Sequence, residues 1–276
     1  MTISYDTEQI LADFAEQQGI TFTMLSDPDS ATIKRFGILN TVADDSLGPN
    51  AEDPDVVEDF AMYVSVTQPS ERFRGIAYPG IFMLDPDGRV TSRFFEEFYQ
   101  ERSTAASIMM RLGVDRPAVE GTEVSTTHMN IKTYPTDPVV ALGERIALVL
   151  EITPLENMHV YAPGADKYRV VTVNIEPQPF VQVLPLQHPD SEIYYLEPLD
   201  ERVPVYQKPF ILLQEVVPEV SREARAAFEG KDTLTLTGSL EYQACDDRLC
   251  YNPVSVPLSW TVKLKPLLFG QRRGRR

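Results

Sequence analysis

The two cysteines of this 276-residue sequence, Cys245 and Cys250, lie close together near one end of the chain. A pair at this spacing can form a disulfide, exchange with other thiols, or supply two ligands to a metal ion. In the chain-entropy model, a disulfide that closes so small a ring contributes only about 2 kcal/mol, against roughly 4.7 kcal/mol for a ring of a hundred residues. The pair is expected on a solvent-reachable loop between two strands, where thiol–disulfide exchange is favoured over a structural role.

A metal centre has little support in the sequence. Two cysteines would need two further ligands, and the histidines His128, His159 and His188 are scattered singly. The sequence also contains no glycine-rich phosphate loop, no Gly-x-Ser-x-Gly elbow and no His-Glu-x-x-His helix. We therefore expect no metal and no cofactor.

The charge of the chain excludes one class of partner. The sequence has 41 acidic and 25 basic residues, a formal net charge of -16, so it should be repelled by nucleic acid. No apolar run is long enough to span a bilayer, and residues 1–6 lack the basic and apolar regions of a signal peptide. Neither membrane insertion nor a signal peptide is expected, and residues 266–276 are interpreted as a solvated basic tail.

Strand and helix patterns alternate over residues 1–113, which predicts an α/β region. One face of an early helix is apolar, and Gly19 ends that helix. Residues 81–95 predict a β-hairpin around a Pro-Asp-Gly turn, and residues 103–112 a closing helix. The acidic residues 41–72 are interpreted as a surface insertion, the role of which the sequence does not indicate.

The pattern changes to a period of two residues over 128–265. Every second residue from Val254 to Leu264 is apolar, and residues 234–242 alternate in the same phase. Further candidate strands at similar spacing predict an antiparallel β-sandwich, with residues 114–127 as a linker before it.

The cysteine motif Tyr242–Pro253, preceded by Met158–Tyr161 and Val203–Tyr206, resembles the amino-terminal domain of the thiol:disulfide interchange protein DsbD. The resemblance covers roughly residues 128–264. It implies an immunoglobulin-like sandwich in the bacterial periplasm, where the cysteine pair takes electrons from a thioredoxin-like partner and passes them to oxidised proteins.

The matching positions make Cys245 and Cys250 the expected catalytic residues, with Tyr242 and Tyr251 flanking them. The residues expected to bind the partner are Tyr242, Tyr251, Arg248 and Pro79. By the resemblance, Cys250 is expected to be the attacking sulfur. Asp246 and Asp247, which directly follow Cys245, also disfavour a thiolate there, whereas the charge of Arg248 favours one. The sequence departs from the family by having four residues between its cysteines where the best-known members have five, so the loop shape and the redox potential differ from the family pattern.

The first region resembles the peroxiredoxins and related redoxins of the alkyl hydroperoxide reductase type. The resemblance rests on segments in the family order, including Gly19–Phe22, Leu25–Pro28, Phe36–Leu39 and Tyr78–Phe82. In that family a proline at the position of Pro79 is often cis and faces the active cysteine. An ordinary turn at Pro79 is an equal alternative from the sequence alone.

The active cysteine of that family would lie upstream of Met1, so residues 1–113 are interpreted as an N-terminally incomplete thioredoxin-like domain with no peroxidase activity expected. The whole chain is predicted to be an α/β plus all-β protein that joins this domain to an immunoglobulin-like sandwich. The function favoured is that of a thiol–disulfide oxidoreductase with a thioredoxin-like partner in an extracytoplasmic compartment. Two alternatives stay open: a non-enzymatic binding module with a structural disulfide, and the remnant of a redoxin.

Overall fold

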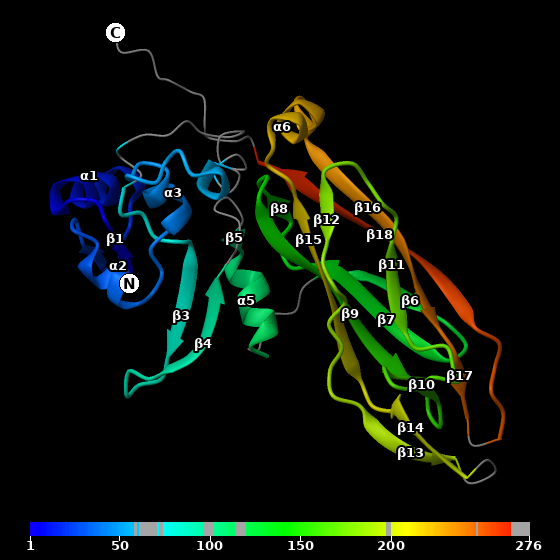
Figure 1. Ribbon diagram of the computed structural model, residues 1–276. Coiled ribbons are helices and arrows are strands. Elements are labelled where there is room, and N and C mark those ends of the chain that lie inside the picture. Colours follow the sequence, from blue (N-terminus) through cyan, green and yellow to red (C-terminus); the bar gives the residue numbers. More distant parts are fainter. Residues whose placement is uncertain are drawn as a thin grey trace. The chain divides into compact units, whose positions relative to one another are not determined.

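The computed structural model describes residues 1–57, 60, 71, 74–95, 102–113, 120–196, 200–246 and 248–265. The chain divides into two units, unit 1 (Met1–Arg102) and unit 2 (Ser103–Arg276) (Figure 1). Parts of the predicted insertion 41–72 and linker 114–127, and the whole predicted tail 266–276, lie outside the described residues.

Unit 1 contains the predicted alternation of strand and helix. A parallel pair of strands is joined through α1, which Gly19 ends in the left-handed conformation (φ 64°). The predicted hairpin is also present, with a tight turn at Gly88. The elements are β1 (Thr2–Ser4), α1 (Glu8–Gln18), β2 (Met24–Ser26), α2 (Ala31–Arg35), α3 (Thr41–Asp45), β3 (Gly80–Leu84) and β4 (Val90–Phe95).

Pro79 lies directly before β3, and Gly80, the first residue of that strand, is closely packed. No peptide bond among the described residues is cis, so the bond between Tyr78 and Pro79 is trans. A Cβ atom on Gly80 would lie 2.2 Å from the ring of Phe95, so only glycine lets that ring cross the backbone there. The structure therefore differs from the cis alternative at Pro79, and Tyr78 and Pro79 form neither a turn nor a regular element.

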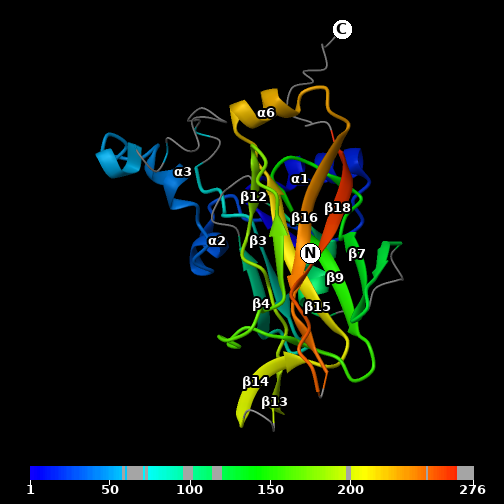
Figure 2. The same ribbon diagram turned by 90° about the vertical axis from the view of Figure 1, so that its right-hand side faces the viewer.

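Unit 2 is a β-sandwich (Figures 1 and 2). One sheet is antiparallel, in the order β12-β15-β9-β7-β6, with β5 pairing β9 off this path. The second has the order β11-β16-β18-β8, antiparallel except for the β18–β8 pair. The first sheet is formed by β5 (Arg102–Ser103), β6 (Thr122–Ser125), β7 (Met129–Pro135), β9 (Glu144–Pro154), β12 (Val181–Val183) and β15 (Phe210–Pro218). The second is formed by β8 (Val139–Val140), β11 (Thr172–Ile175), β16 (Thr233–Tyr242) and β18 (Val254–Leu264).

The alternating residues of β16 and β18 form one wall of the core, as the sequence predicts. Their buried side chains pack against those of β7, β9 and β15 in a single cluster. A polar link crosses the core, because the indole of Trp260 donates to Oγ1 of Thr133 at 2.7 Å. The buried indole N–H is thereby satisfied, so the sandwich has an apolar core with a specific register between its layers.

A third, smaller sheet lies at one end of the sandwich, opposite the end that carries α6 (Arg222–Phe228) (Figure 1). Its strand order is β13-β14-β10-β17. These strands are β10 (His159–Tyr161), β13 (Glu192–Leu196), β14 (Glu201–Tyr206) and β17 (Ala244–Cys245). Because β17 follows β16 and precedes β18, the long hairpin of the sandwich delivers the cysteine loop to this end.

The helix predicted at 103–112 is present as α5 (Ala105–Arg111), but it belongs to unit 2. Ser107 donates to the buried carboxylate of Glu215 at 3.3 Å, and Arg111 lies 3.7 Å from the same carboxylate. Unit 1 therefore ends at Arg102, and α5 contacts Glu215 of β15 within unit 2. The predicted domain limits 1–113 and 128–265 stay a prediction.

Candidate functional site: the cysteine loop

The cysteine loop, residues 245–250, closes on itself through a disulfide. Cys245 and Cys250 are bonded, with Cα atoms 4.1 Å apart, and they form an antiparallel bridge at the mouth of the loop. The two sulfurs differ in access, because Cys245 is fully buried whereas Cys250 is exposed. The expectation of a solvent-reachable loop outside the core is therefore correct for Cys250 and wrong for Cys245, which packs among the side chains of the small sheet.

Asp246 organises the loop. One carboxylate oxygen, Oδ1, accepts from the backbone N–H groups of Arg248 at 2.7 Å and Leu249 at 2.6 Å. The other oxygen, Oδ2, accepts from the hydroxyl of Tyr251 at 2.9 Å. The hydrogen bonds from Arg248, Leu249 and Tyr251 hold the pKa of Asp246 below its usual range. Asp247, the second predicted carboxylate, lies outside the described residues.

An aromatic cluster surrounds the buried sulfur. The hydroxyl of Tyr161, on β10, lies 2.9 Å from Sγ of Cys245 and 3.4 Å from Sγ of Cys250. The Tyr161 ring is fully buried and stacks on Tyr168, with ring centroids 4.0 Å apart. Burial raises the pKa of Tyr161, and the nearby Tyr168 and Glu201 raise it further. The Tyr161 hydroxyl is therefore protonated at neutral pH and able to donate a hydrogen bond to sulfur.

Hydrogen bonds and a ring contact connect Tyr242, just before the loop, to Tyr251, just after it, through His128. Tyr242, at the end of β16, is fully buried, and its hydroxyl donates to Oγ1 of Thr126 at 3.0 Å. Nδ1 of His128 lies 3.2 Å from the same hydroxyl. The ring of His128 also contacts that of Tyr251, with centroids 4.6 Å apart. Burial lowers the pKa of His128, so a neutral imidazole is favoured at this position.

The structure brings most of the predicted site residues together. Arg248 is exposed within the loop, and Tyr251 is half-buried just after it. Tyr242 lies behind the loop, where its hydroxyl contacts Thr126 rather than solvent. Pro79 belongs to unit 1. Partner binding by these four residues stays a prediction.

Sequence reasoning missed Tyr161 and Asp246 as site residues. Tyr161 stands in the segment Met158–Tyr161 that carries the resemblance, yet β10 pairs with β17 from far along the chain, and only this pairing places Tyr161 beside the sulfurs. Asp246 was considered for its charge alone, whereas its acceptor geometry orders the loop. An aspartate beside one cysteine and two residues before Arg248 was the available signal, because such aspartates bond to the backbone ahead of them.

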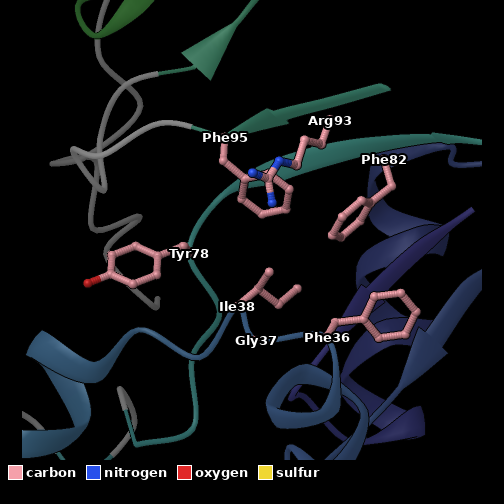
Figure 3. Close-up of a pocket in the computed structure, with 7 residues that line it drawn as sticks. All are labelled: Phe36, Gly37, Ile38, Tyr78, Phe82, Arg93 and Phe95. Carbon is pink, nitrogen blue, oxygen red and sulfur yellow. The ribbon is translucent and has the colours of Figure 1, made fainter. Parts of the chain in front are cut away.

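The aromatic cavity of unit 1 provides a contrast with the cysteine loop. It has a volume of 600 Å³ and its lining, seen in Figure 3, consists of Phe36, Gly37, Ile38, Tyr78, Phe82, Arg93 and Phe95. No thiol, carboxylate or imidazole is among these residues, and the polar side chains of the lining are those of Tyr78 and Arg93. Among the described residues, no group of three or more histidine, cysteine or acidic side chains is placed to hold a metal ion. No helix in the described ranges has the length and apolar character to cross a membrane.

Comparisons with known families match the two regions separately. Residues 1–93 match the AhpC/TSA family, and residues 132–257 match the family described as thiol:disulfide interchange protein DsbD, N-terminal. The chain thus joins a region similar to the AhpC/TSA family to a region similar to the N-terminal part of DsbD. The redoxin-like region precedes a DsbD N-terminal-like, immunoglobulin-like domain, as the sequence predicts. No curated protein gives a significant match to the sequence.

Three solved structures resemble parts of the chain at low identity. The N-terminal periplasmic domain of ScsB from Proteus mirabilis is 13% identical, with a TM-score of 0.36, and the match covers 49% of this chain and 49% of that one. The reduced DsbD N-terminal domain of Neisseria meningitidis is 14% identical, with a TM-score of 0.29 and coverages of 42% and 81%. The collagen-binding subdomain ACE19 of the Enterococcus faecalis surface protein ACE is 12% identical, with a TM-score of 0.19 and coverages of 48% and 95%. The chain thus spans about half the length of the ScsB domain.

Proposed function

We propose that the chain is a thiol–disulfide oxidoreductase that exchanges electrons with a thioredoxin-like protein through Cys245 and Cys250, and that the partner reacts at Cys250. One observation carries the proposal: Cys250 is exposed whereas Cys245 is fully buried. A thiolate must approach a disulfide sulfur in line with the S–S bond, so access decides which sulfur is attacked. The two matched families and the disulfide agree with thiol–disulfide chemistry.

The exchange proceeds in two balanced steps. A thiolate of the partner attacks Sγ of Cys250, the bond between Cys245 and Cys250 breaks, and its electron pair leaves on Cys245 as a thiolate. A second thiolate of the partner then attacks the partner's own sulfur in the mixed disulfide and releases Cys250 as a thiolate. The chain ends as a dithiol after taking up two protons, and the partner ends as a disulfide. The reverse sequence passes electrons to an oxidised protein, with Cys250 as the attacking sulfur.

Tyr161 is placed to stabilise the thiolate that the first step leaves on Cys245. A thiolate on buried Cys245 is disfavoured by the loss of water, because burial penalises charge. The hydroxyl of Tyr161, 2.9 Å from that sulfur, is positioned to donate a hydrogen bond to the leaving thiolate. Because burial keeps this hydroxyl protonated, the donor is available throughout the neutral pH range.

The partner and the compartment follow from the same proposal. Arg248 and Tyr251 are the predicted partner-binding residues that a docked protein could touch beside Cys250. Residues 132–257 match the N-terminal region of DsbD, and on that resemblance we propose an extracytoplasmic location for this chain.

A trapping experiment tests the proposal. Cys245→Ser and Cys250→Ser variants are each incubated with a thioredoxin-fold protein that retains only its attacking cysteine, activated as a mixed disulfide with a small leaving thiol. The Cys245→Ser variant should form the covalent adduct roughly tenfold faster than the Cys250→Ser variant, because its remaining thiol, that of Cys250, is exposed. Faster adduct with Cys250→Ser would exchange the roles of the cysteines.

The alternative function, a non-enzymatic module with a structural disulfide, makes a different prediction. In that case neither variant forms the adduct faster than an unfolded cysteine peptide does. The reduction potential of the pair would then also lie far below the range of thioredoxin, about −270 mV.

A further inference from the structure

Asp246 occupies the centre of the cysteine loop in a way that the exchange steps do not use. Its Oδ1 accepts hydrogen bonds from the backbone N–H groups of Arg248 and Leu249, and its Oδ2 accepts one from the Tyr251 hydroxyl. The carboxylate therefore links the loop to the residue that follows it. The backbone N–H of Asp246 also donates to the carbonyl oxygen of Leu249 at 3.0 Å, which closes the turn from the main-chain side. Asp246, Arg248 and Leu249 are thus tied together by hydrogen bonds that do not depend on the disulfide.

Tyr251, which donates its hydroxyl to Asp246, is itself held by several contacts within unit 2. The N–H of Tyr251 donates to the carbonyl of Ala244 at 2.9 Å, and the side chain of Gln243 donates to the carbonyl of Tyr251 at 3.1 Å. The Tyr251 ring packs against His128. The hydroxyl that reaches Asp246 therefore projects from a fixed residue, and it sets the carboxylate in place relative to the strands on both sides of the loop.

We propose that Asp246 is a positioning residue, which holds the cysteine loop in one shape in both redox states. It thereby sets how readily the disulfide forms. The functional importance of this role rests on the proposed exchange function. Two thiols held at the separation that the disulfide requires have a high effective concentration for each other. Releasing the loop gives the dithiol form conformational freedom that closure must then remove. Loss of Asp246 should consequently favour the dithiol.

Equilibration with glutathione measures this quantity directly. The protein dithiol and one glutathione disulfide are converted to the protein disulfide and two reduced glutathione molecules, so two electrons and two protons pass from the protein thiols to glutathione. The equilibrium constant for oxidation is measured for the full chain by quenching and alkylation across a series of glutathione ratios at constant pH. No partner protein is required.

Two substitutions at Asp246 separate geometry from charge. Asp246→Ala removes all three accepted hydrogen bonds and should lower the equilibrium constant by about tenfold, the size expected for losing hydrogen bonds to a charged acceptor. Asp246→Asn keeps an oxygen for both backbone amides and presents an N–H₂ group to the Tyr251 oxygen, so it should stay within about threefold of the parent. Asp166→Ala, at an exposed carboxylate of the same unit, should leave the constant unchanged.

The outcomes discriminate clearly. Equal shifts for Asp246→Ala and Asp246→Asn would mean that the charge rather than the positioning matters, and would overturn the proposal. No shift, or a shift that favours the disulfide, would also overturn it. If Asp246→Ala does not fold, Tyr251→Phe serves instead, since it removes the hydroxyl alone and should lower the constant by about threefold.

The two experiments test the proposed role of Asp246 and the proposed exchange function independently. A shift with Asp246→Ala together with no adduct in the trapping experiment would leave a positioned but purely structural disulfide. Rapid trapping with no shift would retain the exchange function and remove the role of Asp246.

Discussion

Units 1 and 2 differ in how much apolar surface they bury. In unit 2, strands from two sheets enclose a large cluster of side chains, many of them fully buried, such as Leu150 and Leu240. Among the described residues of unit 1, the buried apolar side chains are Leu11, Ile33, Ala43 and Phe60. Unit 1 leaves large apolar groups exposed instead, with Phe14, Phe22 and Phe36 at 48%, 53% and 54%.

The same contrast extends to the chemistry. Unit 2 holds both cysteines, and a second, smaller cluster of buried side chains in the small sheet encloses Cys245. Unit 1 holds an open aromatic cavity whose lining carries no thiol. The unit with the extensive core is also the one that positions a reactive group, because close-packed neighbours restrict the side chains around it.

The largest expected effect comes from separating the units. A fragment of residues 103–265 should melt cooperatively, whereas a fragment of residues 1–102 should show little cooperative melting, because its small core cannot offset its chain entropy. Calorimetry or circular dichroism on each purified fragment checks this. A sharp two-state transition for residues 1–102 would remove the contrast between the units.

A matched pair of leucine substitutions sharpens the comparison within the intact chain. Leu150→Ala, at a fully buried position on β9, should lower the free energy of unfolding by about 2–5 kcal/mol. Leu25→Ala, at a position of β2 that is 43% exposed, should change it by no more than about 0.5 kcal/mol. Denaturant unfolding followed by the fluorescence of Trp260 reports the first substitution, and circular dichroism reports both. Similar effects at the two positions would contradict the assignment of the main core to unit 2.

A smaller effect, on the rate of disulfide reduction, is expected on removal of the Tyr161 hydroxyl. Tyr161→Phe should slow reduction of the disulfide by a thioredoxin-like protein by about tenfold, because the leaving thiolate on Cys245 loses its hydrogen-bond donor. Stopped-flow measurement of reduction at constant partner concentration checks this. Tyr206→Phe is the control, since the Tyr206 hydroxyl lies in the same small sheet but donates to the carbonyl of Pro189. Equal rates for Tyr161→Phe and the parent would deny Tyr161 this role.

The smallest effect concerns the pH dependence of stability. Burial lowers the pKa of His128 in the folded chain, so the unfolded chain binds a proton more readily. The contribution of His128 to stability is therefore complete above the unfolded pKa of about 6.5 and is lost as the pH falls toward the folded pKa, at up to about 1.4 kcal/mol for each unit of difference.

Urea unfolding of the parent and of His128→Gln at pH 7.5, 6.5 and 5.5 measures this dependence. The parent should lose stability more steeply than the variant as the pH falls. His188, whose pKa is also lowered by burial, is present in both proteins and gives a shared background slope. Parallel slopes would show that His128 does not titrate differently in the folded state.

Much of the fold could be predicted from local patterns. The period-two alternation from Val254 to Leu264 gave β18 its extent and its buried face, because side chains of a strand alternate between two faces whatever it pairs with. The alternating elements of unit 1 and the hairpin of β3 and β4 followed likewise from turns and spacing. The assignment of α5 to unit 2 could not be predicted, since it depends on Glu215, more than a hundred residues away in the chain.

For the site, the sequence by itself determined the reactive atoms and their spacing, with four residues between the two cysteines, and it favoured thiol–disulfide exchange over a structural disulfide. Only the tertiary structure decided which sulfur is accessible and which groups act on it. Pairing of β10 with β17 buries Cys245 and sets the Tyr161 hydroxyl beside it, while Cys250 stays at the surface. Burial and cross-strand contact depend on segments that are distant in sequence, so no local pattern around the cysteines could encode them.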